Sequence, residues 1–351
     1  MGLLRPLIGR RGAALLLGLC LALAGNAGAA QTPSFASPEK IIMDADFGID
    51  DAMALILLAR RPDVQLLGVT TVFGNAQIAD TTRNALFLKD YLGFSAPIAR
   101  GAAKPLIGPT PPPPAWIHGA NGLGNYAMPA PHAALDPRSA PQLIIDVVRS
   151  HPGEVTILAV GRLTNLAAAL AMAPDLLRLA KRVVIMGGAF GYNYQGARQG
   201  ANPFTVAEAN IGGDPEAADA VINAGWPVTL VPLDVTIRTV MDRAYLDALS
   251  GQDGALIRAI TRQTYLSPQG TMPVHDSSAV FYALRPAAYV TVEGVVRVEP
   301  SGGPGAGVTL MEPPGSTDAG FAGHGAIKVA TGVDVPAVLA FYAQTLREGG
   351  H

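Results

Sequence analysis

The sequence is poor in cysteine and in charged residues, and each shortage excludes a class of protein. Its 351 residues contain one cysteine, so no intramolecular disulfide can form. Charged residues make up 15% of the chain and the formal net charge is −2, which excludes a strongly basic surface for nucleic acid. Hydrophobic residues make up 49%, which is ample for the core of one large domain or two small ones.

Long hydrophobic runs are also scarce, and the one that stands out lies near the N-terminus. Arg5, Arg10 and Arg11 precede an apolar run over residues 13–24, and small residues follow at 27–30. This order predicts a signal peptide over residues 1–30, and the run is short for a membrane span of about 20 residues. Cys20 lies within it. We therefore expect an exported protein, periplasmic or secreted, with no membrane association once the leader is cleaved.

Short apolar runs then alternate with helical patterns, which predicts an α/β fold. We expect a Rossmann-like, mostly parallel central sheet flanked by helices, forming a single domain over residues 31–351. The expected strands are 41–43, Val64–Val72, Ala96–Arg100, Val155–Val160, Arg182–Met186, Val228–Val231 and Tyr289–Val298. The first expected helix begins at Asp50. The others cover Ile78–Leu92, Pro141–Ser150, Thr164–Met172, Pro215–Asn223, Ala244–Leu249, Ala255–Tyr265, Ser277–Arg285 and Val335–Arg347. Pro105–Ala134 is expected to be an ordered loop, and Gly191–Pro203 a polar insertion.

An acidic cluster follows the first predicted strand. Asp44 and Asp46 come at its end, and Asp50 and Asp51 open the next helix after a turn at Gly48. The four carboxylates therefore converge where open α/β sheets bind ligands, at the carboxyl end of a strand. Crowded carboxylates raise one another's pKa, and a hard cation such as Ca²⁺ or Mg²⁺ would relieve the repulsion. The alternative is that one aspartate caps the helix and the others are solvated.

The same stretch resembles the signature of the inosine-uridine preferring nucleoside hydrolase family. The family pattern DxDPGxDDAxAL stands here at residues 44–55, with Phe47 in place of the usual proline. Other parts of the chain resemble further family motifs in the same order. They are the TTxxGN asparagine Asn75, the HGxxGLG histidine His118, the GPLTN turn after Val160, the MGG methionine Met186, the ExN pair Glu208 and Asn210, and the HD pair His275 and Asp276.

The resemblance implies calcium-dependent hydrolysis of the N-glycosidic bond of ribonucleosides, releasing free base and ribose. It implies Asp46, Asp51, Asp276 and the carbonyl of Val160 as calcium ligands. It implies Asp46 as the general base and His275 as the group that protonates or hydrogen-bonds the leaving base. The implied substrate-binding residues are Asp50, Asn75, His118, Met186, Glu208 and Asn210. It also implies a homo-oligomer, a dimer or a tetramer, because that is common in the family.

Further expectations concern details of this site. Asp44 would support the other aspartates from behind, and Arg162 replaces the proline of the family's GPLTN turn, which adds a charge. Glu208 and Asn210 would point the same way if their segment is extended. The helix Ala255–Tyr265 would cover the base, with Gln263 as an amide for a pyrimidine edge. The purine-specific group of the family has tryptophan where this chain has His275, so the resemblance places the chain nearer the inosine-uridine and pyrimidine groups. The preference for a purine or a pyrimidine base stays open.

Two rival functions use the same residues. A phosphatase of the haloacid dehalogenase type also has two aspartates after a strand and would use Asp44 as nucleophile, but Gly48 and the Asp50–Asp51 pair disfavour it. A non-catalytic periplasmic protein that binds a nucleoside or calcium could share the pocket. Such solute receptors normally have two comparable lobes, and the pattern indicates one domain.

Overall fold

The computed structural model describes residues 37–191 and 207–349. The predicted signal peptide and nearly all of the predicted insertion lie outside the described residues. All described residues belong to one compact unit that begins at Ser37, in agreement with the predicted single domain. Within them, no helix combines the length and the hydropathy that crossing a membrane requires.

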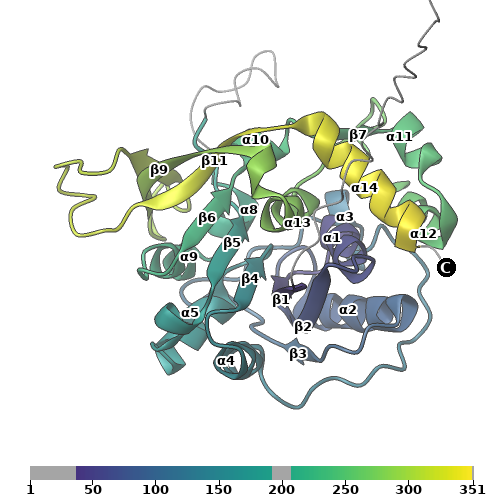
Figure 1. Ribbon diagram of the computed structural model, residues 1–351, viewed down its shortest axis with the longest axis horizontal. Helices are drawn as coiled ribbons and strands as arrows, with labels where there is room; N and C mark the ends of the chain where they lie inside the picture. The colour runs from purple at the N-terminus through teal and green to yellow at the C-terminus, as the bar shows by residue number, and fades with distance from the viewer. Residues whose placement is uncertain (1–36, 192–206, 350–351) are drawn as a thin grey trace, which may run out of the picture. The chain divides into compact units, whose positions relative to one another are not determined.

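A nine-stranded sheet forms the centre of this unit (Figure 1). Within the described sheet, β9 (Tyr289–Val298) alone is antiparallel to the other strands, and the pairs that do not include it are parallel. The mostly parallel sheet of the prediction is thereby confirmed. In sheet order the strands are β10 (Thr309–Glu312), β9 (Tyr289–Val298), β11 (Ile327–Val333), β6 (Val228–Val231), β5 (Arg182–Met186), β4 (Val155–Ala159), β1 (Glu39–Ala45), β2 (Val64–Thr71) and β3 (Ile98–Arg100). A small antiparallel pair, β7 (Val240–Asp242) and β8 (Thr271–Pro273), lies apart from this sheet.

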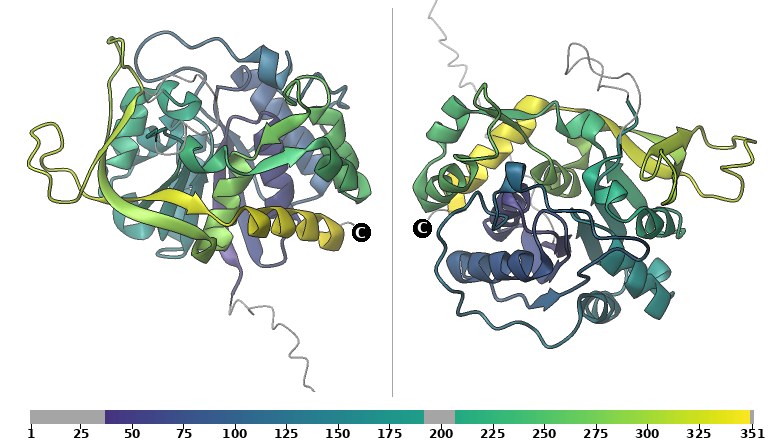
Figure 2. Two further views of the ribbon diagram at one scale, coloured as in Figure 1. Left: turned by 90° about the horizontal axis from the view of Figure 1, so that it is seen from above. Right: turned by 180° about the vertical axis from the view of Figure 1, so that it is seen from behind.

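Helices cover both faces of the sheet, which explains why its central strands are apolar on both sides. One face packs against α1 (Ile49–Ala59), α2 (Ile78–Leu92), α11 (Arg243–Ala248), α12 (Gly251–Thr261), α13 (Asp276–Leu284) and α14 (Val335–Gly349). The other packs against α4 (Ala140–Ser150), α5 (Thr164–Met172), α6 (Leu176–Leu179) and α9 (Pro215–Ile222). Short helical turns complete the fold: α3 (Ala115–His118), α8 (Ala209–Gly212), α10 (Leu233–Thr236) and η1 (Pro286–Ala288). Helix α14, yellow in Figure 2, lies beside α12.

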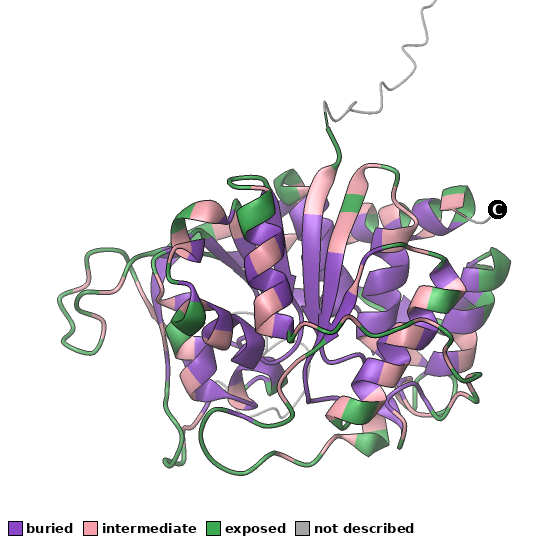
Figure 3. Cartoon of the chain, turned by 90° about the horizontal axis from the view of Figure 1, so that it is seen from below, coloured by how far each residue is buried: buried purple, intermediate pink, exposed green. Residues whose placement is uncertain are grey.

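Strand β1 shows how the sequence produces the two cores. Ile41 and Met43 contribute to the core on the α1 side, and Ile42 between them contributes to the core on the α4 side. Alternate side chains of a strand point to opposite faces, so an uninterrupted apolar run is what a strand buried on both faces needs. Figure 3 shows the central strands buried along most of their length. This rigid centre fixes where the strand ends lie.

The structure corrects several predicted boundaries. The helix expected at Ala255–Tyr265 is α12, which begins at Gly251 and ends at Thr261, so Tyr265 lies beyond it. The loop expected over Pro105–Ala134 contains the helical turn α3. Strands β7, β8, β10 and β11 were not predicted, although β11 lies inside the sheet between β9 and β6.

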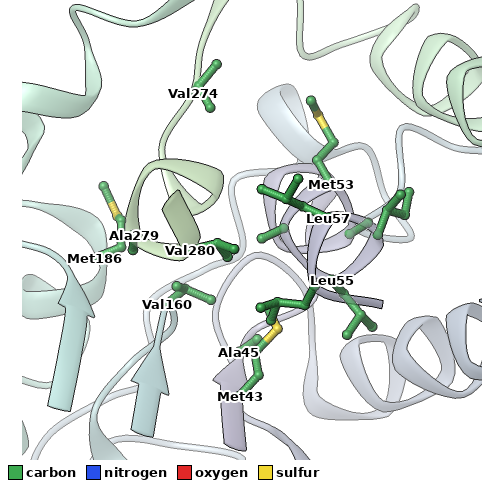
Figure 4. Close-up of a cluster of buried hydrophobic side chains, with 14 of the residues drawn as sticks. Met43, Ala45, Met53, Leu55, Leu57, Val160, Met186, Val274, Ala279 and Val280 are labelled. Atoms are coloured by element: carbon green, nitrogen blue, oxygen red, sulfur yellow. The ribbon is translucent and has the colours of Figure 1, made fainter. Parts of the chain in front are cut away.

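An apolar layer lies beneath the carboxyl edge of the sheet (Figure 4). Ala45, Val160 and Met186 come from the ends of the neighbouring strands β1, β4 and β5, and Ala279 and Val280 of α13 lie against them. All five side chains are buried. Polar side chains at this edge therefore stand on a dry, closely packed floor, where their charges are poorly screened.

Gly124, in the loop that contains His118, lies against the backbone of Ile260 in α12. Its replacement tests this contact. Gly124 and Gly153 have φ of 59° and 77°, so alanine should cost about 1–2 kcal/mol at either position. A Cβ at Gly124 would also overlap the carbonyl oxygen of Ile260, whereas Gly153 has open space. Gly124→Ala should therefore lower the free energy of unfolding by roughly 1–3 kcal/mol more than the Gly153→Ala control. Urea denaturation measures both, and equal losses would contradict the close contact.

Candidate active site

The predicted polar residues converge at the carboxyl edge of the sheet. Asp46 follows β1, Asn75 follows β2, and Val160 follows β4. β1 pairs in parallel with β2 on one side and β4 on the other, so these three segments are neighbours. Met186 ends β5, the next strand. The gathering of side chains from distant motifs thus results from the order of the parallel strands.

Asp51 ties the turn after β1 to the start of α1. Its Oδ1 accepts from the backbone N–H of Asp46 at 3.1 Å, and its Oδ2 accepts from that of Gly48 at 2.8 Å. The side-chain amide of Asn75 donates to Oδ2 of Asp51 at 2.9 Å and to Oδ1 of Asp46 at 3.0 Å. Asp51 therefore does cap the helix, as the alternative interpretation held, and the same carboxylate also belongs to an acidic cluster.

That cluster consists of Asp50, Asp51 and Asp276. Each offers a carboxylate oxygen, and the three oxygens lie within 4.8 Å of one another. Oδ1 of Asp50 and Oδ2 of Asp276 are buried and have no hydrogen-bond partner among the described residues. Unpaired buried carboxylate oxygens at this spacing fit a hard cation, which prefers oxygen ligands.

Burial and mutual repulsion make the ionised cluster unfavourable when no cation is bound. Burial raises the pKa of Asp51 well above its ordinary value, and the charges of Asp46 and Asp50 raise it further. Burial likewise raises the pKa of Asp276, with Asp50, Asp51 and Asp46 adding to the effect. A cation would reverse this balance, because it stabilises the ionised forms.

Asp46 lies next to this cluster, and its carboxylate oxygens accept hydrogen bonds from Asn75 and Arg162. Its Oδ2 accepts from the backbone N–H of Asn75 at 2.9 Å and from Nη1 of Arg162. In this structure Asp50, which was predicted to bind substrate, completes the triad with Asp51 and Asp276 in its place. The roles assigned to Asp46 and Asp50 stay predictions.

Asp44 is hydrogen-bonded to residues outside the acidic cluster, and its expected support of the other aspartates stays a prediction. It is buried, and its Oδ1 accepts from the hydroxyl of Thr70 at 2.6 Å and from the amide of Asn165 at 2.7 Å. Burial raises the pKa of Asp44 to about 7. Its bonds join β1 to β2 and α5, so the residue positions the edge of the sheet.

Glu208 and Asn210 form the opposite side of the site, with one correction. Their segment is not extended throughout, because Glu208 caps the helical turn α8 and Asn210 lies inside it. The amide of Asn210 donates to the carbonyl oxygens of Val160 at 2.9 Å and Met186 at 3.1 Å. The Glu208 carboxylate accepts from the backbone N–H of Asn210, Ile211 and Gly188. Both side chains still reach the same cavity.

The two predicted histidines have different surroundings. His118 is buried, and its Nδ1 accepts from the backbone N–H of Ile49 at 3.2 Å, at the start of α1. His275 is partly buried, and its Nδ1 lies 2.8 Å from the hydroxyl of Thr236 on α10. Burial lowers the pKa of both imidazoles. Each ring is thus held through one nitrogen, which leaves the other available to a ligand.

A cavity of about 720 Å³ opens over these groups. Its lining includes nine of the residues singled out from the sequence: Asp50, Asn75, His118, Val160, Met186, Glu208, Asn210, His275 and Asp276. Asp46 and Asp51 are fully buried beside it. The volume is within the usual range for a small-molecule site, and apolar walls with convergent polar groups are typical of one.

Some cavity residues were missed or misassigned from the sequence. Gln263, suggested as a contact to the base, is exposed and does not line the cavity. Tyr265 lines it instead, with its ring centre 5.4 Å from that of His118. Thr236, the partner of His275, was also missed. Neither position belongs to a motif, and both depend on how loops return to the sheet edge.

Comparisons with known proteins agree on one family. The family model described as inosine-uridine preferring nucleoside hydrolase matches residues 41–340. Uridine nucleosidase 1 of Arabidopsis thaliana is 38% identical, with 90% of this chain and 95% of the relative covered. The inosine-uridine preferring nucleoside hydrolase of Crithidia fasciculata is 37% identical, with 78% and 88% covered. Among solved structures, the purine-preferring ribonucleoside hydrolase from Gardnerella vaginalis superposes with a TM-score of 0.78 at 30% identity, covering 89% and 99%.

Sequence, fold and site therefore lead to the same answer. The family match covers most of the chain, and the solved relative superposes over nearly its whole length. The separate motifs of the sequence meet at one cavity at the carboxyl edge of that sheet. The chain belongs to the inosine-uridine preferring nucleoside hydrolase family and is a hydrolase acting on the N-glycosyl bonds of nucleosides.

Proposed function

We propose that the protein hydrolyses ribonucleosides to free base and ribose with the help of one bound calcium ion. The observation that supports this most strongly is the triad Asp50, Asp51 and Asp276, in which Asp50 and Asp276 each have an unpaired buried oxygen and line a cavity of about 720 Å³. Because relatives are named uridine nucleosidase and inosine-uridine preferring nucleoside hydrolase, uridine and inosine are the first substrates to test.

The proposed ligands of the ion are Asp46, Asp51, Asp276 and the carbonyl of Val160. In the structure the Val160 carbonyl accepts from Asn210, and Asp46 accepts from Asn75 and Arg162. A bound ion would either share these oxygens with the groups that now donate hydrogen bonds to them or displace those groups. Bound calcium would supply positive charge that orients the ribose hydroxyls and acidifies water.

The chain's own side chains would carry out the remaining steps. Breaking an N-glycosidic bond builds positive charge on the sugar and negative charge on the departing base. Asp46 would take the proton of the attacking water, a general-base contribution worth roughly 10²–10⁴-fold. Asp50, Asn75, Glu208 and Asn210 would hold the ribose hydroxyls, with Met186 packed beneath the sugar.

The base would lie between the two histidines. His275 would protonate or hydrogen-bond it as it leaves, held by its contact with Thr236. His118 and Tyr265 border the same cavity and would contact the base from the α12 side. An aromatic ring beside the base also excludes water from the bond being broken.

Export and assembly are part of the same proposal. The arginines and the apolar run of residues 1–30 support export through a cleaved signal peptide, which N-terminal sequencing of the mature protein would check. A homo-oligomer is proposed because dimers and tetramers are common in the family. Light scattering on the purified protein would measure its mass.

The metal assignment predicts that Asp51→Ala abolishes activity through loss of the ion. Protein purified without chelator should contain about one calcium per chain, as one such site implies, and the variant should contain none. Elemental analysis beside a uridine assay measures both. Chelator-treated wild-type protein that stays free of metal and fully active would contradict the assignment.

The ribose assignment predicts strong selection against 2′-deoxyribonucleosides. A site built to bond a hydroxyl leaves its own polar groups unpaired when that hydroxyl is missing, which often costs roughly 10⁴-fold. The kcat/KM for uridine should therefore exceed that for 2′-deoxyuridine by about this factor. Similar values for the two substrates would rule out a ribose-gripping role for Glu208 and Asn210.

The leaving-group assignment predicts that His275→Ala affects natural nucleosides far more than an activated substrate. A nucleobase leaves poorly as an anion, so loss of the imidazole should lower kcat on uridine by about 10²-fold or more. The phenolate of p-nitrophenyl riboside departs without protonation and should be much less affected. Parallel losses on both substrates would show instead that His275 acts by positioning Asp276.

A further inference from the structure

Arg162 is a buried cation next to the acidic cluster. Its side chain is 6% exposed, and Nη1 donates to Oδ2 of Asp46. The guanidinium also lies 5.8 Å from the centre of the Phe73 ring. Burying a guanidinium is costly unless it is paired, so its position depends on the carboxylate. The sequence alone indicates no role for this charge in the turn after β4.

Two glycines leave the space that this side chain occupies. A Cβ at Gly74 would overlap Nη1 of Arg162, and one at Gly213 would overlap Nε. The two glycines come from distant segments, the loop after β2 and the end of α8. The guanidinium therefore occupies a slot between Gly74 and Gly213. A side chain added at either glycine would displace it from Asp46.

The charge of Arg162 reaches both sides of the site. It opposes the effect of burial on the pKa of Asp46, and it does the same for the pKa of Glu208 on α8. Asp46 in turn lies beside Asp51, to which it is joined through the shared amide of Asn75. Arg162 thus already supplies part of the positive charge that the crowded carboxylates require.

We propose that Arg162 is a built-in counter-cation that holds Asp46 in place without a metal ion and competes with a divalent cation for that carboxylate. The inference rests on the proposed metal site. The acidic site then stays assembled when the metal is removed. A divalent cation also binds less tightly than it would without the guanidinium, because like charges repel at short range.

Two substitutions separate charge from packing. Arg162→Met keeps an unbranched side chain in the slot and removes the charge. Arg162→Lys keeps the charge and serves as the matched control, although it loses the planar donor group. Both variants and the wild type are stripped of metal with chelator and then titrated with calcium by calorimetry. Their melting temperatures are measured in chelator and at saturating calcium.

We expect Arg162→Met to bind calcium at least about tenfold more tightly than the wild type, because the substitution removes the repulsion between the guanidinium and the ion at short range. Its melting temperature should fall in chelator by at least about 3 °C more than in saturating calcium. The lysine variant should stay near the wild type in affinity. Unchanged or weaker binding by Arg162→Met, or equal melting losses in both conditions, would overturn the proposal.

Gly213→Ala tests the same contact if the methionine variant does not fold. Gly213 has φ of −73°, which alanine can adopt, and the added Cβ would overlap Nε of Arg162. It would also lie 2.9 Å from the carbonyl oxygen of Ala209, a contact whose cost should be the same in chelator and in calcium. The melting loss should again be larger in chelator than in calcium, and equal losses would overturn the proposal. A wild-type protein that binds no divalent cation would contradict the proposed function, whereas unchanged affinity in Arg162→Met contradicts this inference alone.

Discussion

Crowding of carboxylates at one edge of the sheet is the constraint on which the site depends. Asp46, Asp51 and Asp276 are buried, and charges interact strongly where they are shielded from water. The fold offsets their repulsion with backbone N–H donors, the amide of Asn75 and the guanidinium of Arg162. These donors do not reach the outer oxygens of Asp50 and Asp276, so the remaining demand for positive charge faces the cavity.

The position of this edge could be predicted from the sequence because parallel strands impose it. Residues that end buried apolar runs must meet where the strands end, and Asp46, Asn75 and Met186 do so. The helix after β1 was equally predictable, since Asp51 caps the first turn of α1 by accepting from the backbone N–H of Gly48. Each of these inferences needed only a local pattern and the rule that parallel strands share a direction.

The features that could not be predicted depend on contacts between distant segments. Strand β11 has an irregular register beside Gly332, and its apolar pattern is short, so its place inside the sheet was not visible. Tyr265 reaches the cavity because α12 ends at Thr261 and the chain turns back. The pairing of Arg162 with Asp46 requires space at two glycines that are far apart in sequence. A local sequence pattern carries no information about such contacts between distant segments.

The bond between His118 and the start of α1 restricts the chemistry that the ring can offer. Nδ1 accepts the N–H of Ile49, so the ring proton must sit on Nε2, and the imidazole is confined to a single tautomer. If Nδ1 carried a proton, its N–H would face the backbone N–H of Ile49, and the two donors would repel each other. A solute that meets Nε2 therefore meets a donor, which suits an exocyclic carbonyl oxygen and opposes an exocyclic amino group.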